Sequence, residues 1–390
     1  MKKRELLAIL SSACLILVLV GLTLITACAK TAPAEPIKLG CIFDYTGPMA
    51  STGPMLQEGV ELRLEEANYQ VAGREVQCIF EDGGSDTAIA LDKAKKLVEM
   101  DKVDFVIGPV LSGMRMGVIP YLAEQNVLTI SIHSDPPEAA QWGNAFVYPS
   151  PLNMGGLPLA WYVLDELGYK TATTVGADYV AGQVFVGSVV DELVSQGGEI
   201  VQQQWAPLGT MDWGPYLVNM QTADCVVVWT IDSDIVPFIQ QYREFGLDMP
   251  ILIPEGNVIL SSMVAEQGET FEGITGCLEY QWSLDNSANE KFVAAYEAEF
   301  GNKPEHHQAM AYGATSIFLA GVEETDGDTS FEALKAAILG LNIETPSGPI
   351  SFDANGIGKA NWYICDVRQV DGQWGWYTLH TYEQAVETGP

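Results

Sequence analysis

Short apolar runs alternate with longer amphipathic stretches along the chain from Ile37 onward. The first apolar runs read KLGCIFD, VQCIFED, DFVIGP and NVLTIS, and helical spacing follows the first three over about residues 52–68, 86–100 and 114–125. A repeated strand–helix order is typical of a parallel, doubly wound α/β sheet with helices on both faces.

A second series with the same alternation follows Pro149. Helices are expected near residues 154–167, 181–196, 213–221 and 235–245, and strands over TATTVGA, EIVQQQW, DCVVVWT and PILIPEG. The chain is longer than one such unit usually needs. The sequence therefore predicts two Rossmann-like lobes.

The N-terminus has the pattern of a bacterial export signal. The cationic segment MKKRE precedes an apolar stretch from Leu6 to Ile25, which ends in LITAC at residues 24–28. The small residues before Cys28 resemble a lipobox, which predicts a signal peptide over residues 1–27 and a lipid-anchored tether over residues 28–36. An uncleaved membrane anchor is the alternative, since about 20 apolar residues can span a bilayer. Both readings place the folded chain outside the cytoplasm, in the periplasm or on the outer face of the cell membrane.

The charge balance argues against a nucleic-acid partner. The chain has 51 acidic and 19 basic residues and a net charge of −32. Affinity for nucleic acid comes chiefly from Lys and Arg side chains that neutralise phosphates, and the acidic surface of this protein would repel phosphates.

The cysteines and histidines show no spacing typical of a metal site, and we expect neither a metal nor a cofactor. Cys41, Cys78, Cys225, Cys277 and Cys365 each lie inside an apolar run, so buried thiols are expected. A Cys41–Cys78 disulfide is the alternative in an exported protein. The adjacent pair HH at residues 306–307 precedes the predicted helix QAMAYGATSIFLAG and is expected at its solvated start.

Polar residues directly after the apolar runs are the candidate ligand contacts. Ligands of doubly wound sheets bind outside the carboxyl ends of the strands. If the strand-end loops of the two lobes face one another, they form a cleft between the lobes. A ligand held in that cleft would stabilise closure of the two lobes. The candidates are Asp44, Tyr45, Ser112, Gly113, His133, Ser134, Asp135, Asp178, Tyr179, Trp229, Asp232 and Glu255.

The order of these segments resembles a known family. FDYTGPMASTGPMLQEGVELRLEEAN is similar to the opening of type I periplasmic binding proteins of the Leu/Ile/Val-binding family. EDGGSDTAIALDKAKKLVEMDKVDFVIGPVLSG, VLTISIHSDPPE and DCVVVWTIDSDIVPFIQQYREFGLDMPILIPEG then follow in the family's order. The resemblance extends from about Ile37 to Tyr377.

The resemblance implies a two-lobe clamp that captures a small solute and delivers it to an ABC permease with its ATPase subunits. It also implies three crossings between the lobes, near Pro149, Trp282 and Trp362. Lobe 1 would then comprise residues 37–149 and 283–362, and lobe 2 would comprise residues 150–282 and 363–390.

The family's binding positions carry over only in part. The loop after the third strand, which supplies hydroxyls and helix-start amides to a ligand carboxylate, keeps Ser112 but has Gly113 at its central hydroxyl position. After the fourth strand, where the family places a small residue and a Ser or Thr, the chain has His133, Ser134 and Asp135. A carboxylate there would repel a ligand carboxylate, which predicts a ligand with a donor or a positive charge at that point.

In the second lobe, Glu255 matches the family's acidic residue that receives the ligand's ammonium, and the usual aromatic-glycine pair is displaced to Asp178–Gly182. Asp44 and Asp232 would add negative charge, and aromatic side chains such as Trp229 could supply cation–π faces. An amino acid-like, amide or amine solute is therefore predicted. The alternative is that Asp135 caps a turn before two prolines and the aromatic side chains are core.

Two other functions remain open at this level. The chain could be a ligand-sensing lobe that works with a separate signalling protein, or a hydrolase that uses the Asp, His and Ser of SIHSDPP. The sequence has no GxSxG nucleophile elbow, and three catalytic groups within five residues of one loop rarely reach triad geometry. A non-enzymatic solute-binding protein is favoured.

Overall fold

A computed structural model describes residues 35–385, except for the side chains of Asp232 and Ser233. The predicted signal peptide and lipidation site, residues 1–27 and Cys28, lie outside the described residues. Within the described part, no helix has the length and apolar character needed to cross a membrane. The folded unit begins at Ile37.

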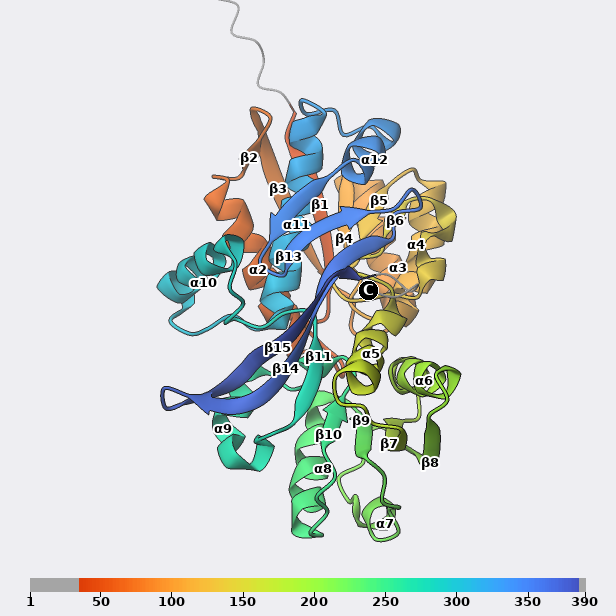
Figure 1. The fold of residues 1–390 in the computed structure, drawn as a ribbon. Coiled ribbons are helices and arrows are strands. Elements are labelled where there is room, and N and C mark those ends of the chain that lie inside the picture. Colours follow the sequence, from red (N-terminus) through yellow and green to blue (C-terminus); the bar gives the residue numbers. More distant parts are fainter. Residues whose placement is uncertain (1–34, 386–390) are drawn as a thin grey trace, which may run out of the picture. The chain divides into compact units, whose positions relative to one another are not determined.

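The first sheet is built by the first strand–helix series and is parallel except for β2, which runs antiparallel to β3 (Figure 1). Its strands β1, β4 and β5 are buried along nearly their whole length, as expected for parallel strands covered on both faces. In spatial order the strands are β2 (Gln70–Val71), β3 (Arg74–Asp82), β1 (Ile37–Phe43), β4 (Phe105–Ile107), β5 (Leu128–Ile130) and β6 (Ala145–Phe146).

The second sheet continues from a parallel half into an antiparallel half. β7 to β11 run parallel, and β14 pairs antiparallel with β11 and carries β15 and β13. Its strands are β12 (Asn342–Thr345), β13 (Gly348–Phe352), β14 (Gly358–Val370), β11 (Thr275–Leu278), β10 (Ile251–Ile253), β9 (Cys225–Trp229), β7 (Thr171–Ala177), β8 (Glu199–Ala206) and β15 (Gln373–Ala385). Two mostly parallel sheets confirm the predicted fold class.

Helices cover the faces of both sheets (Figure 1). Those of the first half of the chain are α2 (Thr52–Glu66), α3 (Thr87–Lys95), η1 (Lys96–Asp101), α4 (Ser112–Glu124), η2 (Pro137–Trp142), η3 (Leu152–Gly155), α5 (Leu157–Asp165) and α6 (Val180–Ser195). Those of the second half are α7 (Gly214–Leu217), α8 (Asp232–Glu244), η4 (Gly256–Val258), α9 (Ser261–Gln267), η5 (Gly268–Phe271), α10 (Ser287–Phe300), α11 (His306–Glu324) and α12 (Phe331–Leu339).

The chain returns to the first sheet late in the sequence. α11 packs against α2 and β4, and the rings of Phe105 and Phe318 lie 5.1 Å apart. A Cβ at Gly59 of α2 would come within 2.3 Å of the Gln308 carbonyl oxygen, so the two helices approach each other closely. This packing places the start of α11 beside the strand ends of the first sheet.

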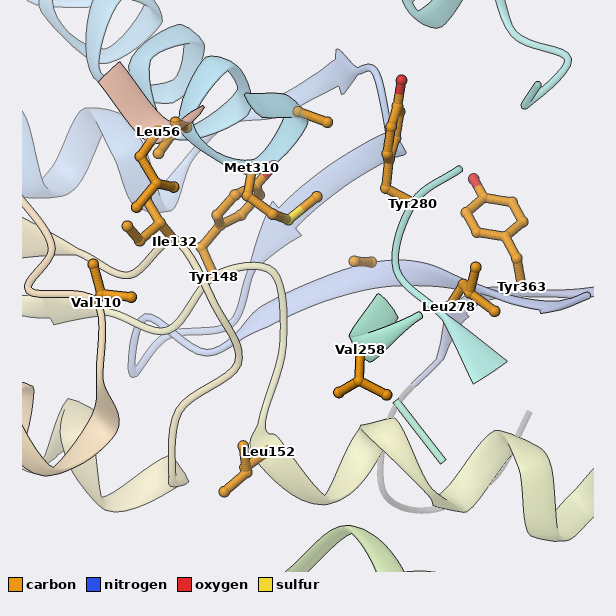
Figure 2. Close-up of a cluster of buried hydrophobic side chains, with 14 of the residues drawn as sticks. Leu56, Val110, Ile132, Tyr148, Leu152, Val258, Leu278, Tyr280, Met310 and Tyr363 are labelled. Atoms are coloured by element: carbon orange, nitrogen blue, oxygen red, sulfur yellow. The ribbon is translucent and has the colours of Figure 1, made fainter. Parts of the chain in front are cut away.

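One apolar cluster links the two sheets. Figure 2 shows part of it, from Leu56 and Met310 on α2 and α11 to Leu278 at the end of β11 and Val258 in η4. Burial of each such aliphatic side chain contributes roughly 1.5–3 kcal/mol relative to exposure. The cluster therefore fixes the elements that carry the strand-end loops of both sheets.

The five described cysteines are free thiols, and all but Cys78 are fully buried. Cys41 Sγ and Cys78 Sγ lie 3.6 Å apart on the neighbouring strands β1 and β3. The buried-thiol interpretation therefore agrees with this structure for Cys41, Cys225, Cys277 and Cys365.

Candidate functional site

A cavity of about 260 Å³ lies at the carboxyl ends of the parallel strands of both sheets. Strand-end loops supply most of its polar lining, as the general rule for doubly wound sheets requires. The polar and aromatic lining side chains are Ser51, Ser112, His133, Ser134, Tyr179, Phe185, Trp229, Glu255, Asn257, Glu279, His306 and His307.

Glu255 occupies the wall beyond β10. Its backbone has a left-handed conformation, with φ of 46°, and its amide donates to the Gly155 carbonyl oxygen at 2.7 Å. The Oε2 atom of Glu255 accepts a hydrogen bond from the indole Nε1 of Trp229 at 3.3 Å. These contacts hold the carboxylate at the cavity wall.

An aromatic surface lies beside Glu255. The ring of Trp229, at the end of β9, lies 5.8 Å from that of Tyr179 and 5.0 Å from that of Phe185 on α6. Three packed rings provide a large apolar contact surface whose π faces can also accept a cation.

Three histidines meet in another part of the lining. The ring centroids of His306 and His307 each lie 5.0 Å from that of His133, and the Nδ1 atoms of His306 and His307 are 3.2 Å apart. Burial, together with the charge of the neighbouring histidines, lowers the pKa of His133 well below its usual value and that of His307 to about 3. The His133 and His307 rings are therefore neutral near pH 7.

Glu279, directly after β11, anchors this cluster. Its Oε2 atom lies 2.7 Å from His306 Nε2, and its Oε1 atom accepts a hydrogen bond from the hydroxyl of Ser134. The carboxylate therefore connects the loop after β5 to the start of α11.

The expectation that His306 and His307 lie at a solvated helix start is wrong. Their exposed fractions are 3% and 6%. α11 begins under the strand-end loops and is buried around most of its circumference, so its first turn faces the cavity. The spacing of histidines along the sequence did not reveal the cluster either, because His133 comes from a segment distant from His306 and His307.

Asp135, for which the sequence predicts a ligand contact, is not part of the cavity lining. Its side chain is 1% exposed and is paired with the guanidinium of Arg115, which is equally buried. Arg115 also donates from Nη1 to the carbonyl oxygens of Gly108 at 2.7 Å and Ile130 at 3.1 Å. Burial raises the pKa of the Asp135 carboxyl, and Arg115 opposes that rise. The positive partner of Asp135 is therefore a residue of the protein.

Four other candidates also lie away from the cavity lining. Asp44 is fully buried and accepts a hydrogen bond from the Ser85 amide at 3.0 Å, and burial raises its pKa. The Tyr45 hydroxyl donates to Gln57. Gly113 is exposed on the first turn of α4, and Asp178 is exposed and accepts from Gln183. The side chains of Asp44, Tyr45 and Asp178 therefore make contacts within the protein, outside the cavity lining.

The remaining predicted positions divide into two groups. Ser112, His133, Ser134, Tyr179, Trp229 and Glu255 line the cavity. Asp232 begins α8, but its side chain is outside the described part, as is Cys28.

Sequence reasoning missed Glu279, His306, His307 and Phe185. Glu279 could have been found, because it follows the buried strand TGCL in the same way that Glu255 follows ILI. The stretch HHQAMAYGATSIFLAG has few charged residues on any face, which is typical of a buried helix and was a signal for the histidines.

Comparisons with known proteins agree on one family. The family model described as "Periplasmic binding protein" matches residues 36–373. The Leu/Ile/Val-binding protein homolog 6 of Brucella suis biovar 1 is 24% identical over 95% of this chain and 98% of its own.

Solved structures give the same result. An ABC transporter substrate-binding protein from Sphaerobacter thermophilus superposes with a TM-score of 0.85 at 26% identity, over 90% of this chain and 98% of that one. A solute-binding protein of an ABC transporter from Rhodopseudomonas palustris BisB5, in complex with 3,4-dihydroxybenzoic acid, gives 0.83 at 24% identity with the same coverage. With its two sheets and its strand-end cavity, the chain belongs to the periplasmic binding protein family, as a type I member of the Leu/Ile/Val-binding group.

Proposed function

We propose that this periplasmic solute-binding protein captures a small amino acid-like or amine solute in the cavity and delivers it to an ABC permease. The observation that carries the proposal is the carboxylate of Glu255, held against the aromatic wall of Trp229, Tyr179 and Phe185. A carboxylate beside π faces is suited to an ammonium or another donor, with the apolar part of the solute on the rings.

The opposite end of the solute would meet the loops of the first sheet. Ser112, on the first turn of α4, lines the cavity and offers a hydroxyl beside helix-start amides. Such amides carry partial positive charge and favour an anionic or carbonyl oxygen. A solute with a donor at one end and an acceptor at the other would therefore contact both sheets.

Contacts from both sheets support clamp closure as the mechanism. A ligand shifts a conformational equilibrium by its differential affinity for the two states, and only the closed state offers both walls at once. Lobe 1, over residues 37–149 and 283–362, would move against lobe 2, over residues 150–282 and 363–390. A lipid on Cys28 would keep the protein at the membrane, close to its permease.

The relatives differ in the solutes that their names give, which makes a broad screen necessary. The Brucella relative is named for leucine, isoleucine and valine, and the Rhodopseudomonas structure contains a dihydroxybenzoic acid. Midpoints of thermal unfolding should be measured with amino acids, amides, amines and benzoates, since a ligand that binds only the folded state raises the midpoint.

We expect a shift with an amino acid or amine, and its loss in Glu255→Gln. Asp178→Asn is the matched control, because it removes an exposed carboxylate outside the cavity. A shift with benzoates alone, equal in both variants, would contradict the assignment of Glu255. Lipidation and delivery need separate tests. For lipidation, labelling with a fatty-acid analogue is compared between the unaltered protein and Cys28→Ala. For delivery, solute uptake is measured in vesicles that contain the permease.

A further inference from the structure

We propose that His133, His306 and His307 bind a late first-row divalent metal ion, such as Zn²⁺, in the wall of the cavity. One ring nitrogen from each histidine lies within 4.8 Å of those of the other two. The site goes beyond the proposed solute capture and can be tested without any solute.

The distance between two of the donor atoms fits a single metal ion. A Zn–N bond is about 2.0–2.1 Å long, so two nitrogens at neighbouring corners of a tetrahedron lie about 3.3 Å apart. His306 Nδ1 and His307 Nδ1 lie 3.2 Å apart. One ion can therefore bind both atoms with little movement of α11.

The third ligand is His133. Its Nε2 atom is buried and has no hydrogen-bond partner among the described residues, which is a costly state for a polar atom. Since its donor lies within 4.8 Å of the others, a shift of about 1.5 Å or less completes a three-nitrogen site with metal-like spacing. A bound ion would also provide an interaction partner for this ring.

Glu279 fixes the tautomer that a metal ligand requires. When His306 Nε2–H donates to Glu279 Oε2, at 2.7 Å, the lone pair of Nδ1 is directed toward the cluster. Ser134 donates to the other oxygen of the same carboxylate, which orients it. A ligating histidine that donates its second N–H to a carboxylate is the usual arrangement around protein-bound zinc.

The set of three imidazoles favours a late first-row metal ion. Three imidazole nitrogens suit zinc, nickel or copper better than magnesium or calcium. All three histidines line the cavity, so an oxygen of a solute could complete the coordination.

The test uses purified protein without a histidine tag, treated with a chelator and then titrated with Zn²⁺ in a calorimeter against a competing chelator. We expect one Zn²⁺ per chain. His133→Ala and His307→Ala should each weaken binding by more than about 100-fold, and Glu279→Gln should weaken it by roughly 10–100-fold. His380→Gln is the control, because His380 lies on β15 and packs against Tyr382.

A second readout needs no substitution at the site. Co²⁺ bound to the unaltered protein should give the intense visible absorption of tetrahedral nitrogen coordination. Zn²⁺ affinity that is unchanged in His133→Ala and His307→Ala, or a weak octahedral Co²⁺ spectrum, would overturn the metal site. Because these measurements contain no solute, and the solute screen can be run with chelator, failure of one proposal leaves the other testable.

Discussion

The buried pair of Asp135 and Arg115 makes a quantitative prediction about stability. Both side chains are 1% exposed. The substitution Asp135→Ala would leave a guanidinium without its counter-ion in a nearly dry environment. Removal of one partner of such a pair typically costs about 3–5 kcal/mol in the free energy of unfolding.

The contacts of Arg115 indicate a loss in the free energy of unfolding near the lower end of that range. Arg115 would keep its hydrogen bonds to the carbonyl oxygens of Gly108 and Ile130, which partly satisfy its charge. We therefore expect Asp135→Ala to lower the free energy of unfolding by about 3 kcal/mol. The double variant Arg115→Met/Asp135→Leu should recover most of that loss, because apolar replacements of a buried ion pair are often close to neutral.

Equilibrium unfolding in urea at pH 7, followed by circular dichroism, measures this difference. Glu297→Gln is the control, because its pair with Lys303 is exposed, at 41% for each side chain, and should contribute less than about 1 kcal/mol. If Asp135→Ala lost no more stability than Glu297→Gln, the assignment of Asp135 to an internal ion pair would be refuted.

Three further predictions concern the structure around the site. Gly59→Ala should destabilise the protein by roughly 1–3 kcal/mol, because its Cβ would meet the Gln308 carbonyl oxygen, whereas Gly187→Ala, a helical position with open space, should be neutral or stabilising in the same urea assay. Burial alone would raise the pKa of Glu81, but hydrogen bonds from Lys93 and Lys96 lower it below 4.5. Glu81→Gln should therefore lower the free energy of unfolding at pH 7. The difference in that free energy between the variant and the parent protein should fade as the pH falls below 4.5. Burial raises the pKa of the Cys41 thiol well above 9.0, so iodoacetamide at pH 8 should alkylate Cys41 only after denaturation, as mass spectrometry of the peptides would show; rapid alkylation of the native protein would contradict its burial.

The fold was largely predictable because it depends on local patterns. Period and length of the apolar runs located the strands and most of the helices, since a buried parallel strand must be apolar on both faces. One element was overestimated. The helix expected over residues 213–221 is the single turn α7 (Gly214–Leu217). The lobe boundaries remain a prediction.

Only those cavity-lining residues whose location depends on their place at the end of a strand could be predicted from the sequence. Ser112, Tyr179 and Glu255 follow parallel strands and Trp229 is the last residue of one, and the strand-end rule locates such residues from sequence alone. Asp135 follows a strand too, but its function depends on Arg115, a charge on α4 that no local pattern connects to it.

The histidine cluster shows the same limit more clearly. His306 and His307 lie on a helix rather than after a strand, and His133 reaches them only through packing of α11 against the first sheet. Spacing along the chain carries no information on such contacts when the ligands come from separate segments. The three-dimensional structure was needed to bring them together.

The central claim is that Glu255 and the aromatic wall recognise the donor end of a solute. A crystal structure of the protein with the solute that gives the largest thermal shift tests this most directly. The account predicts the solute in the cavity, with its ammonium or amine nitrogen about 2.7–3.2 Å from a Glu255 carboxylate oxygen and its apolar part on the ring of Trp229. A solute bound outside the cavity, or bound inside with an anionic group beside Glu255, would contradict it.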